Sequence, residues 1–223
     1  MATALYPLSK TLDPERDYVE LAEELVIVDR HFQRAGEQHP HRRFEYAMAL
    51  RAQSVWIAQH GQMQRVYDVG GANSPFRYMV DSAGPVIIID PDEPVPNSYR
   101  LDQYIAAGAS VADGVFCISV LEHVDDLDQF LYHLSCLVAP GGLLFLTMDC
   151  CQTSGSVHSN GWPEDRYHFH WDRKRIFDEF QRRLLRQRFI AREFQVFGDY
   201  DERWYGPQVM DYSFCSLCMV KRS

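Results

Sequence analysis

The chain has 223 residues, of which 46% are hydrophobic, so its length and composition suit one sizeable core better than two full domains. The formal net charge of -9 at pH 7 argues against a surface for nonspecific nucleic-acid binding, which needs an excess of Lys and Arg. No apolar window is long enough to span a bilayer and the N-terminus lacks the order of a signal peptide, so we expect a soluble, cytoplasmic protein without a membrane partner.

Two helices are expected at the start of the chain. Apolar residues recur at helical spacing in residues 14 to 35, and residues 41 to 60 follow as a second helical segment after the QHPH break. We therefore divide the chain into an N-terminal helical extension, residues 1 to 40, and a main domain, residues 41 to 223.

The main domain alternates between strands and helices. Short, nearly continuous apolar runs predict strands at 65–70, 86–90, 115–120 and 143–148, with two further candidates at 189–197 and 212–221. Helices are expected between them, at 75–82, 125–138 and 172–188. Such an order is typical of parallel strands covered on both faces, so the expected fold class is α/β: a doubly wound, mostly parallel, Rossmann-like sheet with helices on both faces.

The stretch VYDVGGANSPF reads as a strand that runs into a glycine turn and then a helix. Gly70 and Gly71 allow the backbone to approach a ligand closely, Ser74 is a candidate N-cap, and Pro75 suits the first helical position. Alternatively, the stretch is an ordinary tight turn between a strand and a helix.

An acidic residue ends the second expected strand. Asp90 stands where a carboxylate can accept hydrogen bonds from both ribose hydroxyls of an adenosine-type ligand. Its alternative role is to cap the turn into Pro91, and Asp92 is a second candidate for the ribose contact. The cysteines add no metal site, because Cys215 and Cys218 would point to opposite faces of a strand.

Four stretches together resemble the class I S-adenosylmethionine-dependent methyltransferases. They are VYDVGGANS, VIIIDPD, ADGVFCISVLEHVDD and LVAPGGLLFLTM, and they occur in the order and at the intervals of that family. The first resembles its acidic, glycine-rich loop, the third its fourth-strand segment, and APGG the turn before its fifth strand. The resemblance covers about residues 41 to 221, so it implies that the main domain is a methyltransferase domain.

The resemblance implies S-adenosylmethionine as the cofactor. Asp68 and Gly70 would line its methionine end, Asp90 would hold its ribose, and Asp102 would meet the adenine amino group. The full set of expected cofactor-binding residues is Asp68, Gly70, Gly71, Ala72, Asp90, Asp102, Ser119, Arg43 and Tyr46. Ala72 and Ser74 replace glycines of the family loop, which leaves open how closely the loop follows the cofactor.

Two segments depart from a regular pattern. The prolines that follow Asp90 leave little room before Asp113, so we expect a shortened third strand and helix. In HRRFEYAMALR, Arg43 and Tyr46 lie one helical turn apart and could reach the cofactor carboxylate or the acceptor. Alternatively, the apolar residues of this segment only pack on the sheet.

Candidate catalytic residues follow the fourth and fifth strands. By resemblance, Glu122 and His123 face the acceptor, and the loop PEDRYHFHWD adds Asp165, His168 and His170. Glu122, His123 and His168 are the preferred catalytic set. The alternatives are that Glu122 ties its loop to the protein and that the histidines pack.

The methyl acceptor is expected to be a small molecule or glycan-like. SVLEHV lacks the motifs of enzymes that methylate nucleic-acid bases. One alternative is a metal-assisted RNA ribose methyltransferase with Glu122, His123 and His168 or His170 as ligands, although Ser119 replaces an upstream glutamate of that family. Others are a nicotinamide dehydrogenase, disfavoured by Pro75 at a glycine position, and a noncatalytic module.

Overall fold

The computed structural model describes most of the chain, with gaps. The described residues are 14–35, 42–71, 74–90, 98–124, 126–151, 155–157, 168–172, 182–186, 189–191 and 213–222. Ala72 and Asp165 lie outside them, as do much of the expected helix at 172–188 and the end of the expected strand at 189–197.

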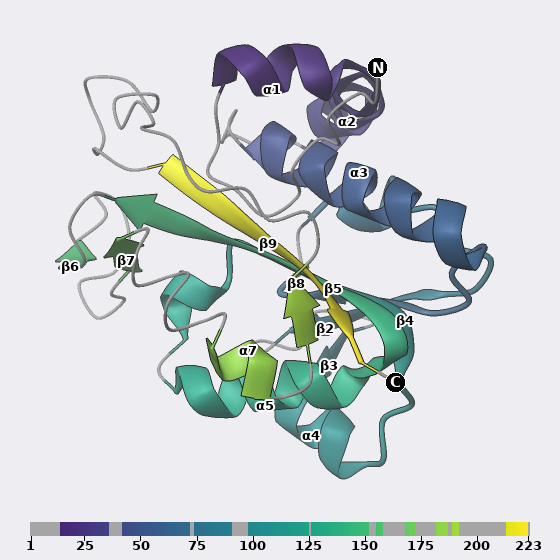
Figure 1. The fold of residues 1–223 in the computed structure, drawn as a ribbon, viewed down its shortest axis with the longest axis vertical. Helices are drawn as coiled ribbons and strands as arrows, with labels where there is room; N and C mark the ends of the chain where they lie inside the picture. The colour runs from purple at the N-terminus through teal and green to yellow at the C-terminus, as the bar shows by residue number, and fades with distance from the viewer. Residues whose placement is uncertain are drawn as a thin grey trace.

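A mixed, mostly parallel sheet forms the centre of the molecule (Figure 1). Its strands are β1 Val66–Val69, β2 Val86–Asp90, β3 Ser98–Arg100, β4 Ala112–Ile118, β5 Val138–Cys151, β6 Gly155–Val157, β7 His168–Asp172, β8 Phe189–Ala191 and β9 Ser213–Lys221. The path β3-β2-β1-β4-β5-β7 is parallel throughout, while β9 pairs with β5 and with β8 in antiparallel fashion. The predicted fold class is therefore confirmed.

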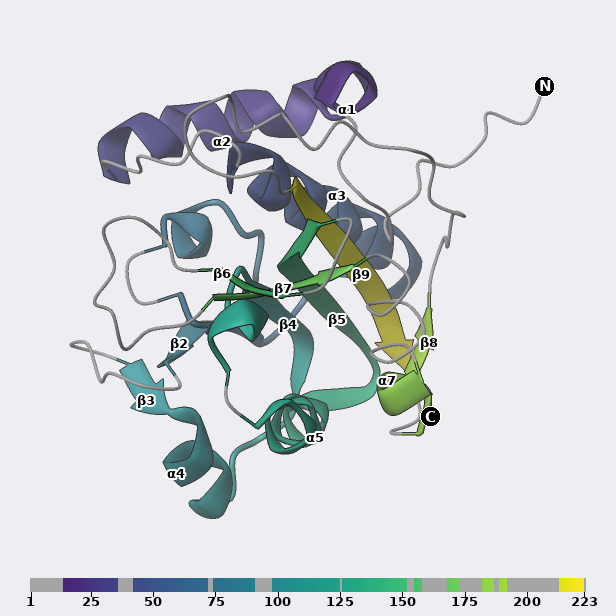
Figure 2. The same ribbon diagram turned by 90° about the vertical axis from the view of Figure 1, so that its left-hand side faces the viewer.

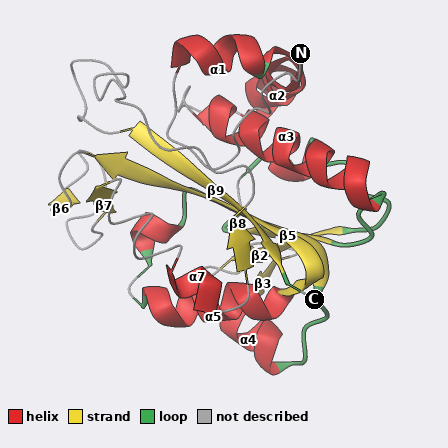
Figure 3. Ribbon diagram, viewed as in Figure 1, coloured by secondary structure: helices red, strands yellow, loops and turns green. Residues whose placement is uncertain are grey.

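Helices cover both faces of the sheet (Figures 1 and 3). Those on one face are α1 Pro14–Glu20, α2 Ala22–Ala35 and α3 Arg42–His60; those on the other are α4 Leu101–Ala106, α5 Leu127–Leu137 and α7 Arg182–Arg186. Among the described residues, no helix combines the length and the apolar character needed to cross a membrane.

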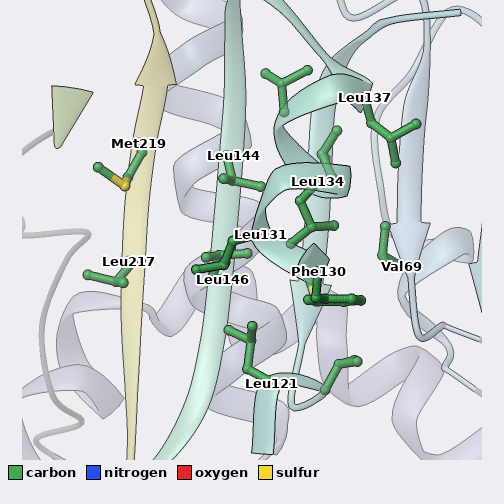
Figure 4. Close-up of a cluster of buried hydrophobic side chains, with 14 of the residues drawn as sticks. Val69, Leu121, Phe130, Leu131, Leu134, Leu137, Leu144, Leu146, Leu217 and Met219 are labelled. Atoms are coloured by element: carbon green, nitrogen blue, oxygen red, sulfur yellow. The ribbon is translucent and has the colours of Figure 1, made fainter. Parts of the chain in front are cut away.

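Side chains alternate between two cores along each strand. In β5, Leu144 and Leu146 face α5, where they belong to the cluster shown in Figure 4, whereas Leu143 and Phe145 belong to the cluster under α3. Burying a side chain of this size stabilises the fold by about 1.5 to 3 kcal/mol. The continuous apolar runs of the sequence are the consequence of this two-sided burial.

The prediction of a helix at 75–82 is wrong, because the structure has a short 3-10 helix, η1, at Phe76–Tyr78. The Ser74 hydroxyl accepts from Phe76 N at 3.0 Å, as expected for a residue that starts a turn. Gln53 of α3 then bonds the backbone of Asp81 twice, at 2.9 Å to its carbonyl and 3.0 Å from its N–H. These contacts fix the backbone at Asp81, beyond the end of η1.

Other boundaries also differ from the sequence predictions. The third strand and its helix are short, as expected, with 3 residues in β3 and 6 in α4. β5 begins before the APGG turn rather than after it, because Val138 already pairs with Ala112 and the register shifts between Ala112 and Gly114. The segment with His168, expected as a loop, begins strand β7.

Helix α2 lies beside α3 (Figure 2), and its buried residues belong to the same hydrophobic cluster. Leu21, Leu25 and Val28 are buried in the same cluster as the inner face of α3. Arg51 of α3 binds the Glu24 carboxylate, with 2.8 Å between Nη2 and Oε2. Apolar burial and this ion pair together fix α2 on α3.

Candidate functional site

The carboxyl ends of three parallel strands meet at one edge of the sheet. Val69 of β1 pairs with Ile89 of β2 on one side and with Cys117 of β4 on the other. Gly70 N then donates to Ile89 O at 2.7 Å, so the glycine turn begins as an extension of the β1–β2 pair. In sheets of this kind, ligands bind at this edge.

Asp68 is a carboxylate buried at this edge. It is 1% exposed, and its Oδ2 has no hydrogen-bond partner among the described residues. Burial raises the pKa of Asp68 to about 7, against the opposing effect of the Arg77 guanidinium. A buried acceptor of this kind favours a ligand that brings a donor or a positive charge.

The two glycines of the turn have no room for a side chain. A Cβ on Gly71 would lie 2.1 Å from Asp68 Oδ2, and a Cβ on Gly70 would lie 2.2 Å from Val120 Cγ2. Gly70 also has a φ of +79°, which residues with a side chain adopt rarely. The bare backbone is therefore required by the Asp68 carboxylate on one side and by the turn after β4 on the other.

A second buried carboxylate lies in the turn after β4. Glu122 belongs to the 3-10 helix η2, Leu121–His123, and is 3% exposed. Burial, with the nearby charges of Glu122 and Asp68, raises the pKa of Cys117 well above its usual range. The two carboxylates are thus close enough to act on one buried thiol.

Glu45 and Thr147 also support this turn, and neither was predicted from the sequence. Glu45 of α3 is completely buried and accepts a hydrogen bond from Ser119 Oγ at 2.6 Å and one from Thr147 Oγ1. The expected cofactor residue Ser119 is thus bonded through its hydroxyl to the protein. The available signal was an acidic residue inside the otherwise apolar segment FEYAMAL.

The expected adenosine-binding residues lie along the β2–β3 side of the edge. Asp90 ends β2 and pairs in register with Arg100 of β3. Asp102 is exposed in the first turn of α4, where hydrogen bonds from Arg100 and from Gln103 N lower its pKa. Asp90 is therefore half-buried at the strand end, and Asp102 is on the surface beside it.

The two candidates from α3 differ in their surroundings. Tyr46 is buried, and its ring stacks on Phe76 with 6.1 Å between centroids and an interplanar angle of 20°. Arg43 donates to Asp29 Oδ2 of α2 at 2.7 Å. The Tyr46–Phe76 contact places α3 directly over the segment that follows the glycine turn.

The acceptor-side candidates lie on η2 and β7, which are neighbours in space. β7 continues the sheet at the far end of β5, where Trp171 pairs with Cys150, and it forms a hairpin with β6 (Figures 1 and 2). The backbone at His168 and His170 is therefore brought near Glu122 and His123. Within the described part of the chain, no group of three or more His, Cys, Asp or Glu residues is arranged to hold a metal ion.

Comparisons with known proteins agree with this geometry. Residues 39–197 match the methyltransferase-domain family. Among curated proteins, none matches the sequence.

Two solved structures with the same fold are similar over nearly the whole chain. One is 1,6-didemethyltoxoflavin-N1-methyltransferase from Burkholderia thailandensis, with bound 1,6-didemethyltoxoflavin and S-adenosylhomocysteine; it is 15% identical, with 97% of this chain and 94% of that chain covered and a TM-score of 0.54. The other is N-methyltransferase NodS from Bradyrhizobium japonicum with S-adenosylhomocysteine; it is 13% identical, with 93% and 99% covered and a TM-score of 0.53. At these identities the likeness shows the fold.

Proposed function

Because the chain belongs to the class I S-adenosylmethionine-dependent methyltransferases, we propose that it methylates a small-molecule or glycan-like acceptor. S-adenosylmethionine is the cofactor of this family, which confirms the cofactor predicted from the sequence. The observation that carries the proposal is the buried Asp68 carboxylate. Its Oδ2 has no hydrogen-bond partner among the described residues, and it lies beside Gly70 and Gly71, which have no room for a side chain.

The charges at the edge suit this cofactor. S-adenosylmethionine carries an ammonium and a sulfonium, and its bound form supplies an activated methyl group for in-line displacement. Asp68 and Glu122 are both buried. Because charges interact more strongly in the protein interior than in water, these carboxylates would stabilise the positive charge of the bound cofactor. Asp90, at the end of β2, would accept hydrogen bonds from the ribose hydroxyls, and Asp102 would contact the adenine amino group. Arg43 remains a candidate for the cofactor carboxylate.

The residues of η2 and β7 would serve the acceptor. Holding the two reacting atoms in line can supply about 7 to 11 kcal/mol of the barrier, so positioning is the first task of these residues. His123 would take a proton from a hydroxyl or amine acceptor, with Glu122 and His168 as the other expected catalytic residues. No resident metal is part of the proposal.

The acceptor class is inferred from what the chain lacks and from its charge. SVLEHV has none of the base-methylation motifs, and the net charge of -9 disfavours a phosphate-rich substrate. The 1,6-didemethyltoxoflavin bound to the Burkholderia enzyme is an example of a small molecule on this fold. We also propose residues 1–40 as the helical extension, 41–223 as the catalytic domain, and the cytoplasm as the location.

Labelled cofactor tests the acceptor class. Small hydroxylated metabolites, sugar nucleotides and short RNAs would be screened with and without a chelator. We expect label in a small acceptor, unaffected by the chelator and lost in His123→Ala. Label in RNA alone, abolished by the chelator and restored by a divalent ion, would replace this proposal with the metal-assisted RNA ribose methyltransferase.

A further inference from the structure

A closed ring of hydrogen bonds joins α3 to the end of β4 and to β5. Glu45 Oε2 accepts from the hydroxyls of Ser119 and Thr147, and the first of these bonds measures 2.6 Å. Ser119 N donates in turn to Thr147 Oγ1 at 3.1 Å. Because β4 and β5 pair at Ile118 and Thr147, the ring fixes the point where β4 ends.

Ser119 has a backbone conformation that residues with side chains avoid. Its φ is 50°, and among the described residues it is the one non-glycine with a positive φ. Conformations of this kind persist only where the surroundings hold them. Here the N–H and the hydroxyl of Ser119 are both bonded within the ring, and Glu45 is the member that receives both hydroxyls.

The residue held in this way begins the turn that lines the candidate site. Val120 follows it and packs so closely on Gly70 that a Cβ there would lie 2.2 Å from Val120 Cγ2. His123 N donates to Val120 O at 3.0 Å, so Glu122 and His123 follow the same turn. A different φ at Ser119 would therefore move Val120, which packs on Gly70, and with it Glu122 and His123.

We propose that Glu45 is a positioning residue for methyl transfer. By binding the Ser119 and Thr147 hydroxyls, it keeps Ser119 at a positive φ and holds the turn after β4 in the shape that cofactor and acceptor require. This inference rests on the proposed function. It assigns the Ser119 hydroxyl to Glu45, so Ser119 contributes to cofactor binding through the position of its backbone.

Two substitutions of Ser119 separate positioning from direct contact. Ser119→Ala removes the hydroxyl and leaves a residue that resists a positive φ, whereas Ser119→Gly removes the same hydroxyl and adopts that φ without strain. We expect Ser119→Ala to raise the Kd for S-adenosylhomocysteine about tenfold, and Ser119→Gly to stay within about threefold of the wild type. Equal losses would overturn the inference, because both variants lack the hydroxyl that a direct contact would need.

Substitutions of Glu45 test the other end of the ring. Glu45→Gln keeps the size and one acceptor oxygen, so it should raise the Kd for S-adenosylhomocysteine less than Glu45→Ala does. Glu23→Gln, in the first turn of α2, is the matched control and should behave as the wild type. Glu45 variants that lose stability but keep the wild-type Kd for S-adenosylhomocysteine would reduce Glu45 to a purely structural residue and overturn the inference.

Two readouts keep this inference separate from the proposed function. Binding of S-adenosylhomocysteine by the wild type tests the proposed function; its absence would overturn that function and with it the catalytic role of Glu45. The unfolding free energies of the two Ser119 variants test the hold on φ without any ligand. Ser119→Gly should be the more stable, and the reverse order would overturn the inference even if the wild type binds.

Discussion

Asp68 couples the candidate site to the stability of the whole chain. Its folded-state pKa of about 7 lies above the ordinary 3.8, because burial penalises the charged carboxylate. Because the pKa of Asp68 is higher in the folded state, its contribution to the free energy of unfolding is present in full below the pKa of the unfolded chain. This contribution is lost as pH rises through the folded-state pKa. The relevant window therefore runs from about pH 4 to about pH 7.

Asp68→Asn should remove this pH dependence. Across the window, the contribution of this group to the wild-type free energy of unfolding is expected to fall by several kcal/mol, on the order of one per pH unit. Other titrating groups are common to both proteins and cancel in the difference. Urea unfolding of both at several pH values measures it, and parallel curves would show that Asp68 is ionised as readily in the fold as in the unfolded chain.

Gly70→Ala should weaken cofactor binding beyond the cost of its backbone conformation. Gly61 has a similar φ of +87° with nothing within 4 Å of its Cβ position, whereas a Cβ on Gly70 meets Val120. Both alanine variants should lose about 1 to 2 kcal/mol of stability from the positive φ. Only Gly70→Ala should raise the Kd for S-adenosylhomocysteine, by at least about tenfold. Similar dissociation constants in the two variants would contradict the close fit of the turn.

Residues that share a motif were predictable, and residues that meet only in the fold were not. Asp68, Gly70 and Gly71 lie in one short stretch, so their proximity could be inferred from sequence. The Glu45 network joins positions that are 74 and 102 residues apart. No local pattern relates them, and Glu45 in isolation is compatible with a solvated helix position.

At the level of elements, α2 is part of the core although it precedes the family match. Val28 is 0% exposed and Val26 is 52% exposed on the same helix, so the two residues form a matched pair. Val28→Ala should lower the free energy of unfolding by about 2 kcal/mol, and Val26→Ala should stay within about 0.5 kcal/mol. Chemical denaturation measures both. Equal effects would mean that α2 is not packed on α3 in solution.

Helix and strand types were easier to predict than their boundaries. The strands of the parallel core were visible as apolar runs because both of their faces are buried. The helix expected at 75–82 failed because Gln53, far away in sequence, binds the Asp81 backbone. The strand containing His168 was not predicted, since its pairing partners in the described part of the chain are the end of β5 and the short strand β6, both distant from any long apolar run around His168.

For the whole molecule, the layered arrangement of a sheet between two helical layers brings the site residues to one edge (Figure 1). Asp68 lies on β1, Asp90 ends β2 and Ser119 follows β4, and these three strands are separate in sequence and parallel in space. The expected order of strands and helices was sufficient to predict that edge. The support from α3 depended on tertiary packing and required the structure.

Calorimetric titration of the wild-type protein with S-adenosylhomocysteine, and separately with NAD, tests the central claim most directly. The buried Asp68 carboxylate, the two glycines that have no room for a side chain and Asp90 at the end of β2 together suit a cationic nucleoside cofactor without a phosphate clamp. We expect saturable binding of S-adenosylhomocysteine and no heat of binding with NAD. Binding of NAD alone, or no binding of either ligand, would contradict the assignment of this edge as a methyltransferase cofactor site.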